Sequence, residues 1–470
     1  MIFGRNSLLI ILLLGLGSGL LRANNLRFSG VSSDFESVFF EISWDNAWNL
    51  DQGVENHDAI WIFAKFLGED GQWHHLPFHT DSLLHEVDGS SGLAIVPSSQ
   101  GEGVMLKNEQ IGARNVSDVK LKLRLAQFVT LTSFRFRIYG IEMAYVSEGP
   151  FWLGDGGSNS CLGDNTLQPY LISNEQAIPL GQLQSQADFP PDQTVPESFP
   201  KGYSGFYLMK YELGQAQYAD FLNTLTYAQQ QARTAASPHS AKGTLAMSVG
   251  QANRNAIVIE TSGEAGGVAA TYACDNDNDG SQNSHVDAQN RACNWLNWDD
   301  LMAYLDWAAL RPMTEFEFEK AARGPNMPIL GEFAWGTDSI IDANNVIEDG
   351  SPLETVTETA TASAGLGSHG YTGPQGPLRA GFGSHANSNR LQAGAGYYGN
   401  MELSGNLWEF CVPAFAGGLS FQGGYGDGTI SDSGTANVPD WPSEGGYRGG
   451  GWNSGIIPGF RDLAISDRFY

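Results

Sequence analysis

Two long glycine-rich segments, 363–398 and 417–450, most constrain the fold of this chain, because neither has the hydrophobic periodicity of a helix or a strand. Irregular segments of this length are uncommon inside a compact domain and are often functional loops. The chain has 58 glycines among 470 residues, and 41% of its residues are hydrophobic. This composition is typical of a globular protein. We therefore expect a loop-rich domain whose loops are held by bound ions or by aromatic packing.

The charge and the first residues bear on partners and compartment. A formal net charge of −27 argues against nucleic acid or an anionic membrane surface as a partner, and it supplies carboxylates for divalent cations. Residues 1–23 contain the basic residue Arg5, an apolar run over 8–16 and a small residue, Ala23, at the expected cleavage site. This pattern predicts a cleaved signal peptide. The run is too short to span a bilayer. We expect a secreted or otherwise extracytoplasmic protein, in the periplasm, on the cell surface or outside the cell, without membrane insertion after cleavage.

Residues 24–140 have the pattern of an all-β unit. The segments 38–44 and 59–66 are rich in β-branched and aromatic residues, and 119–125 and 134–138 alternate apolar residues with cations. Strands of this kind, separated by turn-rich segments, predict an amino-terminal β-sandwich. The pattern changes near residue 141, so we expect a second unit over 141–470.

Helical signals occur only in the second unit. The apolar spacing predicts helices over 215–225 and 299–310. A third helix is expected from Thr314, because Thr314 and Glu317 have the spacing of a capping box, and Gly324 and the proline after it end that helix. The chain is therefore expected to be α+β, with few helices and many loops.

Four cysteines and one acidic loop are the candidate structural groups. In an exported chain an even count permits two disulfides. Cys274 and Cys293 bracket one short polar loop and are paired first, and Cys161–Cys411 follows only by elimination.

The loop between Cys274 and Cys293 begins Asp-Asn-Asp-Asn-Asp-Gly at 275–280. Its carboxylates at the first, third and fifth positions and its glycine at the sixth predict a calcium site, although the glutamate expected at the twelfth position is absent. The alternative is an acidic surface loop without an ion. The predicted ligands are Asp275, Asp277, Asp279, Asn283 and Asp287.

Five further segments carry a family resemblance. They lie at 143–155, 205–218, 294–324, 405–410 and 448–452, and they include Gly-Asn-Leu-Trp-Glu-Phe and Arg-Gly-Gly-Gly-Trp in the last two. Together they make residues 141–470 resemble the formylglycine-generating enzyme, or sulfatase-modifying factor, family. The resemblance implies a loop-rich mixed fold related to C-type lectins. More loosely, the amino-terminal unit resembles domains that precede such folds in exported bacterial proteins.

The resemblance also implies a second calcium site beside the Gly-Asn-x-Trp-Glu motif. The matching positions are Glu402, Gly405, Leu407 and Glu409, and the alternative for Glu409 is a pairing with an arginine. A further site of the family would lie near Asn345.

The active residues of the family are the ones that do not match. Its enzymes oxidise a substrate cysteine with two cysteines that hold copper, and here Ser454, Gly459 and Phe460 stand in that neighbourhood. Without thiolates no copper is expected. We expect a binding or structural protein with calcium, without catalytic residues, recognising an envelope or extracellular protein or a glycan. The alternative is an oxidoreductase of the formylglycine-generating type, or another enzyme, that uses the same pocket.

Overall fold

The structure is a computed structural model that describes residues 25–34, 36–50, 53–127, 135–185, 193–370, 373–385, 388–457 and 460–469. The predicted signal peptide therefore lies outside the described residues. In the part that is described the fold is mixed α/β, with many short strands and few helices. Among these helices, none has the length and apolar character that crossing a membrane requires.

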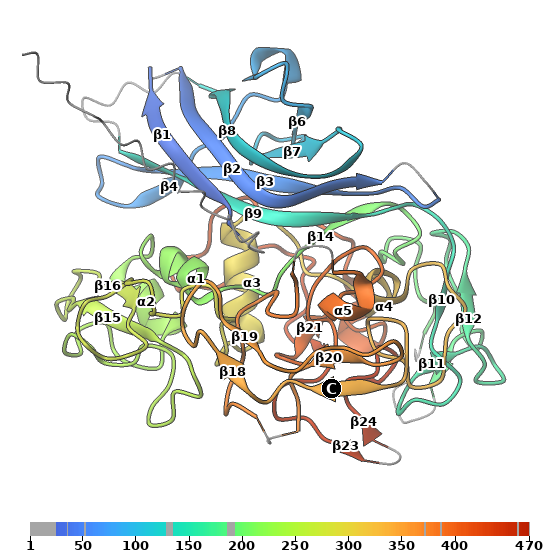
Figure 1. The fold of residues 1–470 in the computed structure, drawn as a ribbon. Coiled ribbons are helices and arrows are strands. Elements are labelled where there is room, and N and C mark those ends of the chain that lie inside the picture. Colours follow the sequence, from blue (N-terminus) through green and yellow to red (C-terminus); the bar gives the residue numbers. More distant parts are fainter. Residues whose placement is uncertain are drawn as a thin grey trace, which may run out of the picture.

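Ten strands form one hydrogen-bonded assembly in the order β14-β9-β3-β2-β8-β5, with β1 on β2, β4 and β7 on β3, and β6 on β7. Figure 1 shows it as a layer above the rest of the chain. The strands are β1 (Arg27–Ser33), β2 (Ser37–Leu50), β3 (Asn56–Leu67), β4 (Trp73–His75), β5 (Glu86–Val87), β6 (Leu93–Pro97), β7 (Val104–Asn108), β8 (Gly112–Arg124), β9 (Phe136–Val146) and β14 (Phe206–Met209).

Alternating side chains give this layer its core. β2 and β3 pair with each other only at their hairpin, at Asn49↔His57 and Leu50↔Asn56, and each then pairs with other strands. Phe40, Ile62 and Leu123 belong to one buried cluster contributed by both groups of strands. The predicted strands 38–44 and 59–66 lie within β2 and β3, and 119–125 is confirmed in β8 except for its last residue, Leu125, which forms an isolated bridge with Phe78. Of the predicted strand 134–138, residue 134 lies outside the described residues and β9 begins at Phe136.

The β layer and the remainder of the chain share a strand pair. The expected boundary at 140–141 falls inside β9, and β14, which comes 60 residues after β9 ends, pairs with it from Phe206↔Val146 to Met209↔Met143. The Trp61 indole of β3 also donates to the Ala308 carbonyl at 2.8 Å. The second unit is thus joined to the first by backbone pairing as well as by side-chain contacts.

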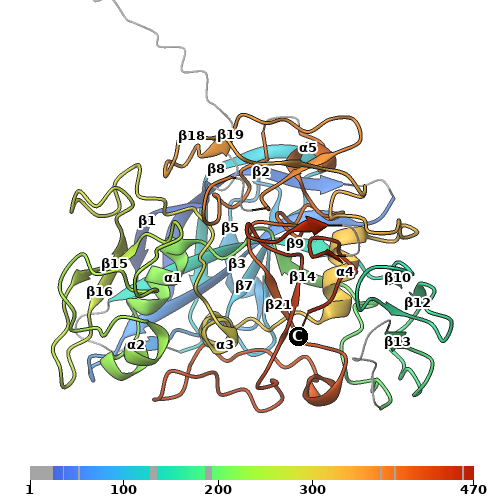
Figure 2. The ribbon, with the colours of Figure 1, turned by 90° about the horizontal axis from the view of Figure 1, so that it is seen from below.

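The helices lie below the layer, as Figure 2 shows from that side. They are α1 (Gln215–Leu222), α2 (Tyr227–Arg233), α3 (Trp298–Trp307), α4 (Glu315–Arg323) and α5 (Arg390–Ala393), with short 3-10 turns η1 (Ser82–Leu84) and η2 (Ala416–Ser420). The three predicted helices are confirmed: α1 and α3 end before the predicted residues 225 and 310, and α4 ends at Gly324 as predicted. Thr314 and Glu317 form the predicted capping box of α4, and Gly324 ends it with φ +72°. α2 and α5 were not predicted, because each is short and α5 lies inside a glycine-rich segment.

Short strand pairs connect the loops of the second unit. These strands are β10 (Phe151–Leu153), β11 (Leu162–Gly163), β12 (Tyr170–Ile172), β13 (Gln184–Ser185), β15 (Ile257–Thr261), β16 (Thr271–Cys274), β17 (Ile340–Asp342), β18 (Val346–Ile347), β19 (Thr355–Val356), β20 (Gly365–Gly367), β21 (Glu409–Cys411), β22 (Gly446–Arg448), β23 (Ile456–Ile457) and β24 (Phe460–Arg461). Pairs this small bury little apolar area, so other interactions must hold the loops.

Candidate metal centres

The loop after β16 brings three of its predicted ligands together. One carboxylate oxygen from each of Asp275, Asp277 and Asp287 lies within 4.8 Å of the other two. Asp275 is buried, and its Oδ1 has no hydrogen-bond partner. Burial and then the charge of Asp287 raise the pKa of Asp275. A buried, unpaired carboxylate beside two others is suited to a hard divalent cation. We call this group the loop centre.

Two predicted ligands of that loop do not join the group. Asp279 is exposed and accepts a hydrogen bond from the Ser281 amide at 2.6 Å. The Asn283 side chain accepts from the Cys274 amide at 3.0 Å. Asn278, Gly280 and Asn283 have φ values of +57°, +81° and +58°, so the loop turns sharply at each. The structure thus does not bring Asp279 and Asn283 into this group, and their assignment as ligands stays a prediction.

A second buried cluster contains Glu402 and Glu409, and also Glu212. Both carboxylate oxygens of Glu409 are inaccessible and have no hydrogen-bond partner. Burial, followed by the charges of Glu212 and Glu402, raises the pKa of Glu409 well above its usual value. Burial likewise raises the pKa of Glu402 to about 8. We call these three residues the glutamate centre.

The glutamate centre contains oxygen atoms of the kind that calcium takes as ligands. Glu402 accepts from the Gly381 amide with both oxygens at 2.9 Å, and Glu212 accepts from the Leu407 amide at 2.9 Å. Within the described residues, no group donates a hydrogen bond to the carbonyls of Gly405 and Leu407. Carboxylate and carbonyl oxygens are the ligands that calcium takes, but among the described residues only the three aspartates of the loop centre have carboxylate oxygens within 4.8 Å of one another. Sequence reasoning missed Glu212, whose signal was its place in one of the family motifs; its contact with the 402–409 segment is visible only in three dimensions.

The alternative partner for Glu409, an arginine, is occupied elsewhere. Glu409 of β21 lies opposite Arg448 of β22, but the Arg448 guanidinium donates to Glu315 and Glu319 of α4. No lysine or arginine in the described part of the chain forms an ion pair with Glu409. Gly449 permits the close approach, because a Cβ there would lie 2.2 Å from Glu409 Oε2.

An acidic residue also contacts Asn345, near which the resemblance implies a further calcium site. Glu358 accepts a hydrogen bond from the Asn345 amide at 3.1 Å. The two residues flank the β18–β19 pair, and the Thr357 amide also donates to the Asn345 carbonyl at 3.0 Å.

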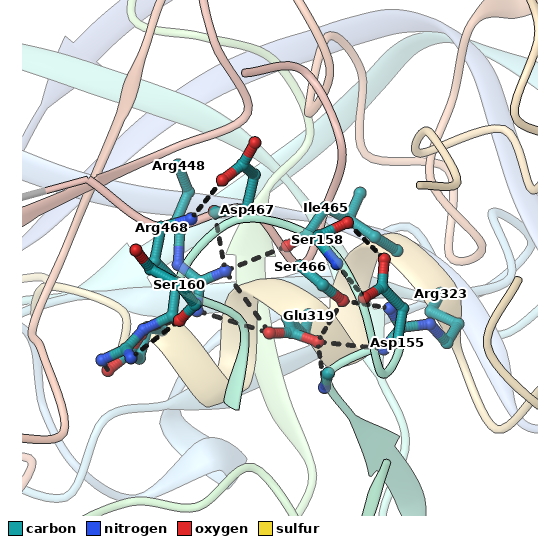
Figure 3. Close-up of polar contacts among 12 residues, drawn as sticks. Asp155, Ser158, Ser160, Glu319, Arg323, Arg448, Ile465, Ser466, Asp467 and Arg468 are labelled. Atoms are coloured by element: carbon teal, nitrogen blue, oxygen red, sulfur yellow. Dashed lines mark hydrogen bonds and ion pairs between the residues drawn. The ribbon is translucent and has the colours of Figure 1, made fainter. Parts of the chain in front are cut away.

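Buried charges fix the closing segment to α4 (Figure 3). Glu315 pairs with Arg448 and Arg468, each at 2.7 Å, and Glu319 pairs with Arg323 at 3.0 Å and with Arg448 at 3.3 Å. All five side chains are at most 1% exposed. These acidic residues therefore hold the carboxyl-terminal segment, in agreement with an ion-pairing role rather than acid–base catalysis.

Asp467 in this segment leads to a pH prediction. Burial and the charge of Asp462 raise its pKa to about 7, and its Oδ2 has no hydrogen-bond partner. The folded protein therefore binds more protons than the unfolded chain between pH 4 and pH 7, and this group lowers stability as the pH rises. Asp467→Asn should gain stability over the wild type by at most about 1.4 kcal/mol per pH unit across that window, measured by urea unfolding. A difference that is flat or decreases with pH contradicts this account.

The residues at the family's redox positions have structural contacts. Ser454 is buried, its hydroxyl accepts from the Gly451 amide at 2.9 Å, and its carbonyl accepts from the Gly370 amide at 2.8 Å. Gly459 lies outside the described residues. Cys411 packs on Phe318 of α4 in a buried cluster.

The two predicted disulfides are absent from the structure. All four cysteines are buried free thiols. Burial raises the pKa of Cys161 and Cys274 to about 12, and it raises those of Cys293 and Cys411 well above their usual value. Burial and then the charge of Asp155 raise the pKa of Cys161, and burial raises the pKa of Cys293. The cysteine count permitted these two pairings but gave no distance between the thiols, and neither bond is present in the structure.

Comparison with known proteins agrees with this architecture. The model of the sulfatase-modifying factor enzyme 1-like domain matches residues 165–454, more than half of the chain. A formylglycine-generating enzyme from Thermomonospora curvata is 27% identical over 230 residues. That match covers 46% of this chain and 65% of the relative, so the chain spans just under two thirds of the relative's length.

Proposed function

Because the chain belongs to the sulfatase-modifying factor enzyme 1-like domain family, we propose that it is an exported binding or structural protein that keeps the family scaffold without its cysteine oxidation. Calcium at the loop centre and the glutamate centre holds the irregular segments. The partner is an envelope or extracellular protein, or a glycan.

The observation that carries the proposal is the residue chemistry at the closing turn. Ser454 is a hydroxyl engaged in the turn, and neither Gly459 nor Phe460 can supply a sulfur. A copper site for cysteine oxidation needs soft thiolate ligands. The four cysteines are buried, and their raised pKa values keep them protonated near neutral pH. The residues present therefore do not fit copper.

The calcium assignment is supported by two separate arrangements of oxygen atoms. The unpaired Asp275 oxygen and the unpaired Glu409 carboxylate are each buried among other carboxylates. Leaving such charges without a cation is unfavourable. Calcium accepts the irregular sets of oxygen ligands that loops provide.

The remaining parts of the proposal concern compartment and recognition. The predicted signal peptide and the net charge of −27 support a location outside the cytoplasm and a partner other than nucleic acid. A β-sandwich for the amino-terminal layer and a C-type-lectin-like arrangement for the second unit are the finer fold assignments that we propose. Lectin-like relatives bind through loop surfaces, which this chain has in abundance.

The competing function is an oxidoreductase, and the name of the Thermomonospora curvata relative favours it. The test is formylglycine formation on a Cys-x-Pro-x-Arg peptide with copper supplied, followed by mass spectrometry. We expect no product above the protein-free blank, because the chain has no accessible thiolate pair.

The relative from Thermomonospora curvata serves as the active control in that assay. Turnover by this chain that disappears in Cys411→Ser would overturn the proposal and assign a catalytic thiol. Turnover that survives Cys411→Ser would also contradict it, by a route that uses other residues.

A further inference from the structure

A cavity of about 880 Å³ lies where the β layer meets the second unit. Trp61 of β3 and Met105 of β7 line it from the layer, and Leu301 and Leu305 of α3 line it from below. This volume lies within the range of small-molecule sites. The closing turn at Ser454 does not contribute to the lining.

The wall of this cavity is rich in aromatic rings. Those of the second unit that contribute include Tyr207, Tyr211, Trp295, Trp408 and Tyr425. Trp295 is 46% exposed and Tyr425 is 62% exposed, so large rings stand at its opening. Exposed aromatic rings gathered at a concave surface are typical of a ligand-binding site.

The backbone at Trp295 is held in an unusual conformation. Its φ is +66°, a region that bulky residues rarely adopt. The indole N–H donates to the Ala252 carbonyl at 2.8 Å, which fixes the ring at the rim. Strain of this kind persists where the surrounding structure imposes it, and it is enriched at ligand sites.

The charges on the wall are mostly negative. Its carboxylates are Glu102, Glu212, Glu317 and Glu409, and Arg311 is the single cation among the described lining residues. Arg311 is engaged, because it donates to both oxygens of Glu317 at 2.6 and 2.8 Å. Its guanidinium also lies 5.6 Å from the centre of the Tyr425 ring, so this wall already holds one cation against an aromatic face. Glu317 is paired with Arg311, and Glu212 and Glu409 belong to the glutamate centre, so Glu102 supplies the remaining negative charge of the wall.

We propose that this cavity binds a small organic cation with an apolar body, of the quaternary ammonium class. Aromatic faces attract a cation whose charge is spread over methyl groups, and the acidic wall adds a favourable field. The same wall disfavours an anion and gives a neutral apolar molecule no electrostatic gain. The inference goes beyond the proposed function, because it names a ligand that neither metal centre requires.

The experiment uses the full chain in calcium-saturated buffer, with choline and its neutral isostere 3,3-dimethyl-1-butanol as probes. Binding is followed by calorimetry and by tryptophan fluorescence. Choline should bind roughly tenfold or more tightly than the alcohol, because the two differ in charge and hardly in shape. Equal affinities, or binding of neither probe, overturn the proposal.

Trp295→Leu identifies the site, with Trp73→Leu as the matched control. Trp73 lies on β4, where Arg137 covers its ring, and it does not line the cavity. Choline affinity should fall roughly tenfold in Trp295→Leu and stay unchanged in Trp73→Leu. Equal effects of the two substitutions, with both variants folded by circular dichroism, would place the binding elsewhere and overturn the proposal.

Because calcium is saturating throughout, loss of metal cannot imitate loss of the ligand. A wild-type chain that shows calcium-dependent stabilisation but no choline binding would leave the proposed function standing and reject this inference alone.

Discussion

Glu315→Gln is expected to lower the free energy of unfolding by about 3–5 kcal/mol, the range for breaking a buried ion pair on one side. Glu315 accepts from Arg448 and Arg468 and from the Ala414 amide. Burial alone would raise its pKa, but Arg468 and Arg448 hold the pKa at about 2. The amide of glutamine removes the negative charge that both guanidinium groups face at this position, while Arg448 keeps its pair with Glu319. Urea unfolding at pH 7 measures the loss.

The control for this prediction is Glu86→Gln, which removes a surface pair with Lys122 and should cost under about 1 kcal/mol. The pH dependence adds a second check. The folded pKa of Glu315 is depressed, so its contribution is present above about pH 4.5 and is lost as the pH falls toward 2. The difference between wild type and Glu315→Gln should therefore shrink in acid. Equal costs for the two variants at pH 7 would show that the closing segment does not depend on α4.

Calcium is expected to raise the melting temperature of the protein above its value in EDTA. At a hundred times the dissociation constant, each occupied site adds about 2.7 kcal/mol, so two sites add about 5 kcal/mol. The reason is that the unfolded chain does not hold the oxygens of Asp275, Asp277 and Asp287, or those of the glutamate centre, in one place. Scanning calorimetry in EDTA and in excess calcium measures the shift.

The effect of Glu409→Gln on stability should have opposite signs in EDTA and in calcium. In EDTA the variant should be at least as stable as the wild type, because it removes one of three buried carboxylates that repel one another. In calcium it should be less stable, because the centre has lost a charged ligand.

At the loop centre, Asp277→Asn should lose part of the calcium shift, with the exposed Asp432→Asn as its control. Calcium shifts of wild-type size in both centre variants would remove both assignments.

Local sequence signals predicted the regular elements well. Composition rich in β-branched and aromatic residues predicted the strands in β2 and β3, alternation predicted the strand in β8, and the Thr314 capping box predicted α4. Each signal depends on residues a few positions apart. The spacing of Asp275 and Asp277 likewise placed two oxygens that meet in the loop centre. Such features are decided within one turn or one strand.

Features that depend on distant contacts were not predictable in this way. Glu212 lies in a segment nearly 200 residues upstream of Glu409, yet its charge acts on that residue. The guanidinium of Arg448, opposite Glu409 in the strand pair, donates instead to Glu315 of α4. Asp279 fits the pattern of a ligand, but its carboxylate turns back to the loop amides. Cysteine counting gave pairs without distances, and the four thiols are free. In each case the partner is selected by the tertiary fold.

The most direct test of the central claim, that a scaffold without the redox cysteines keeps its cation centres, is the calcium content of the purified chain. After equilibration with calcium and dialysis against metal-free buffer, elemental analysis should find two calcium ions per chain in the wild type. It should find one in Asp277→Asn and one in Glu409→Gln. No calcium above the buffer level in the wild type, or the same content in all three proteins, would contradict the account.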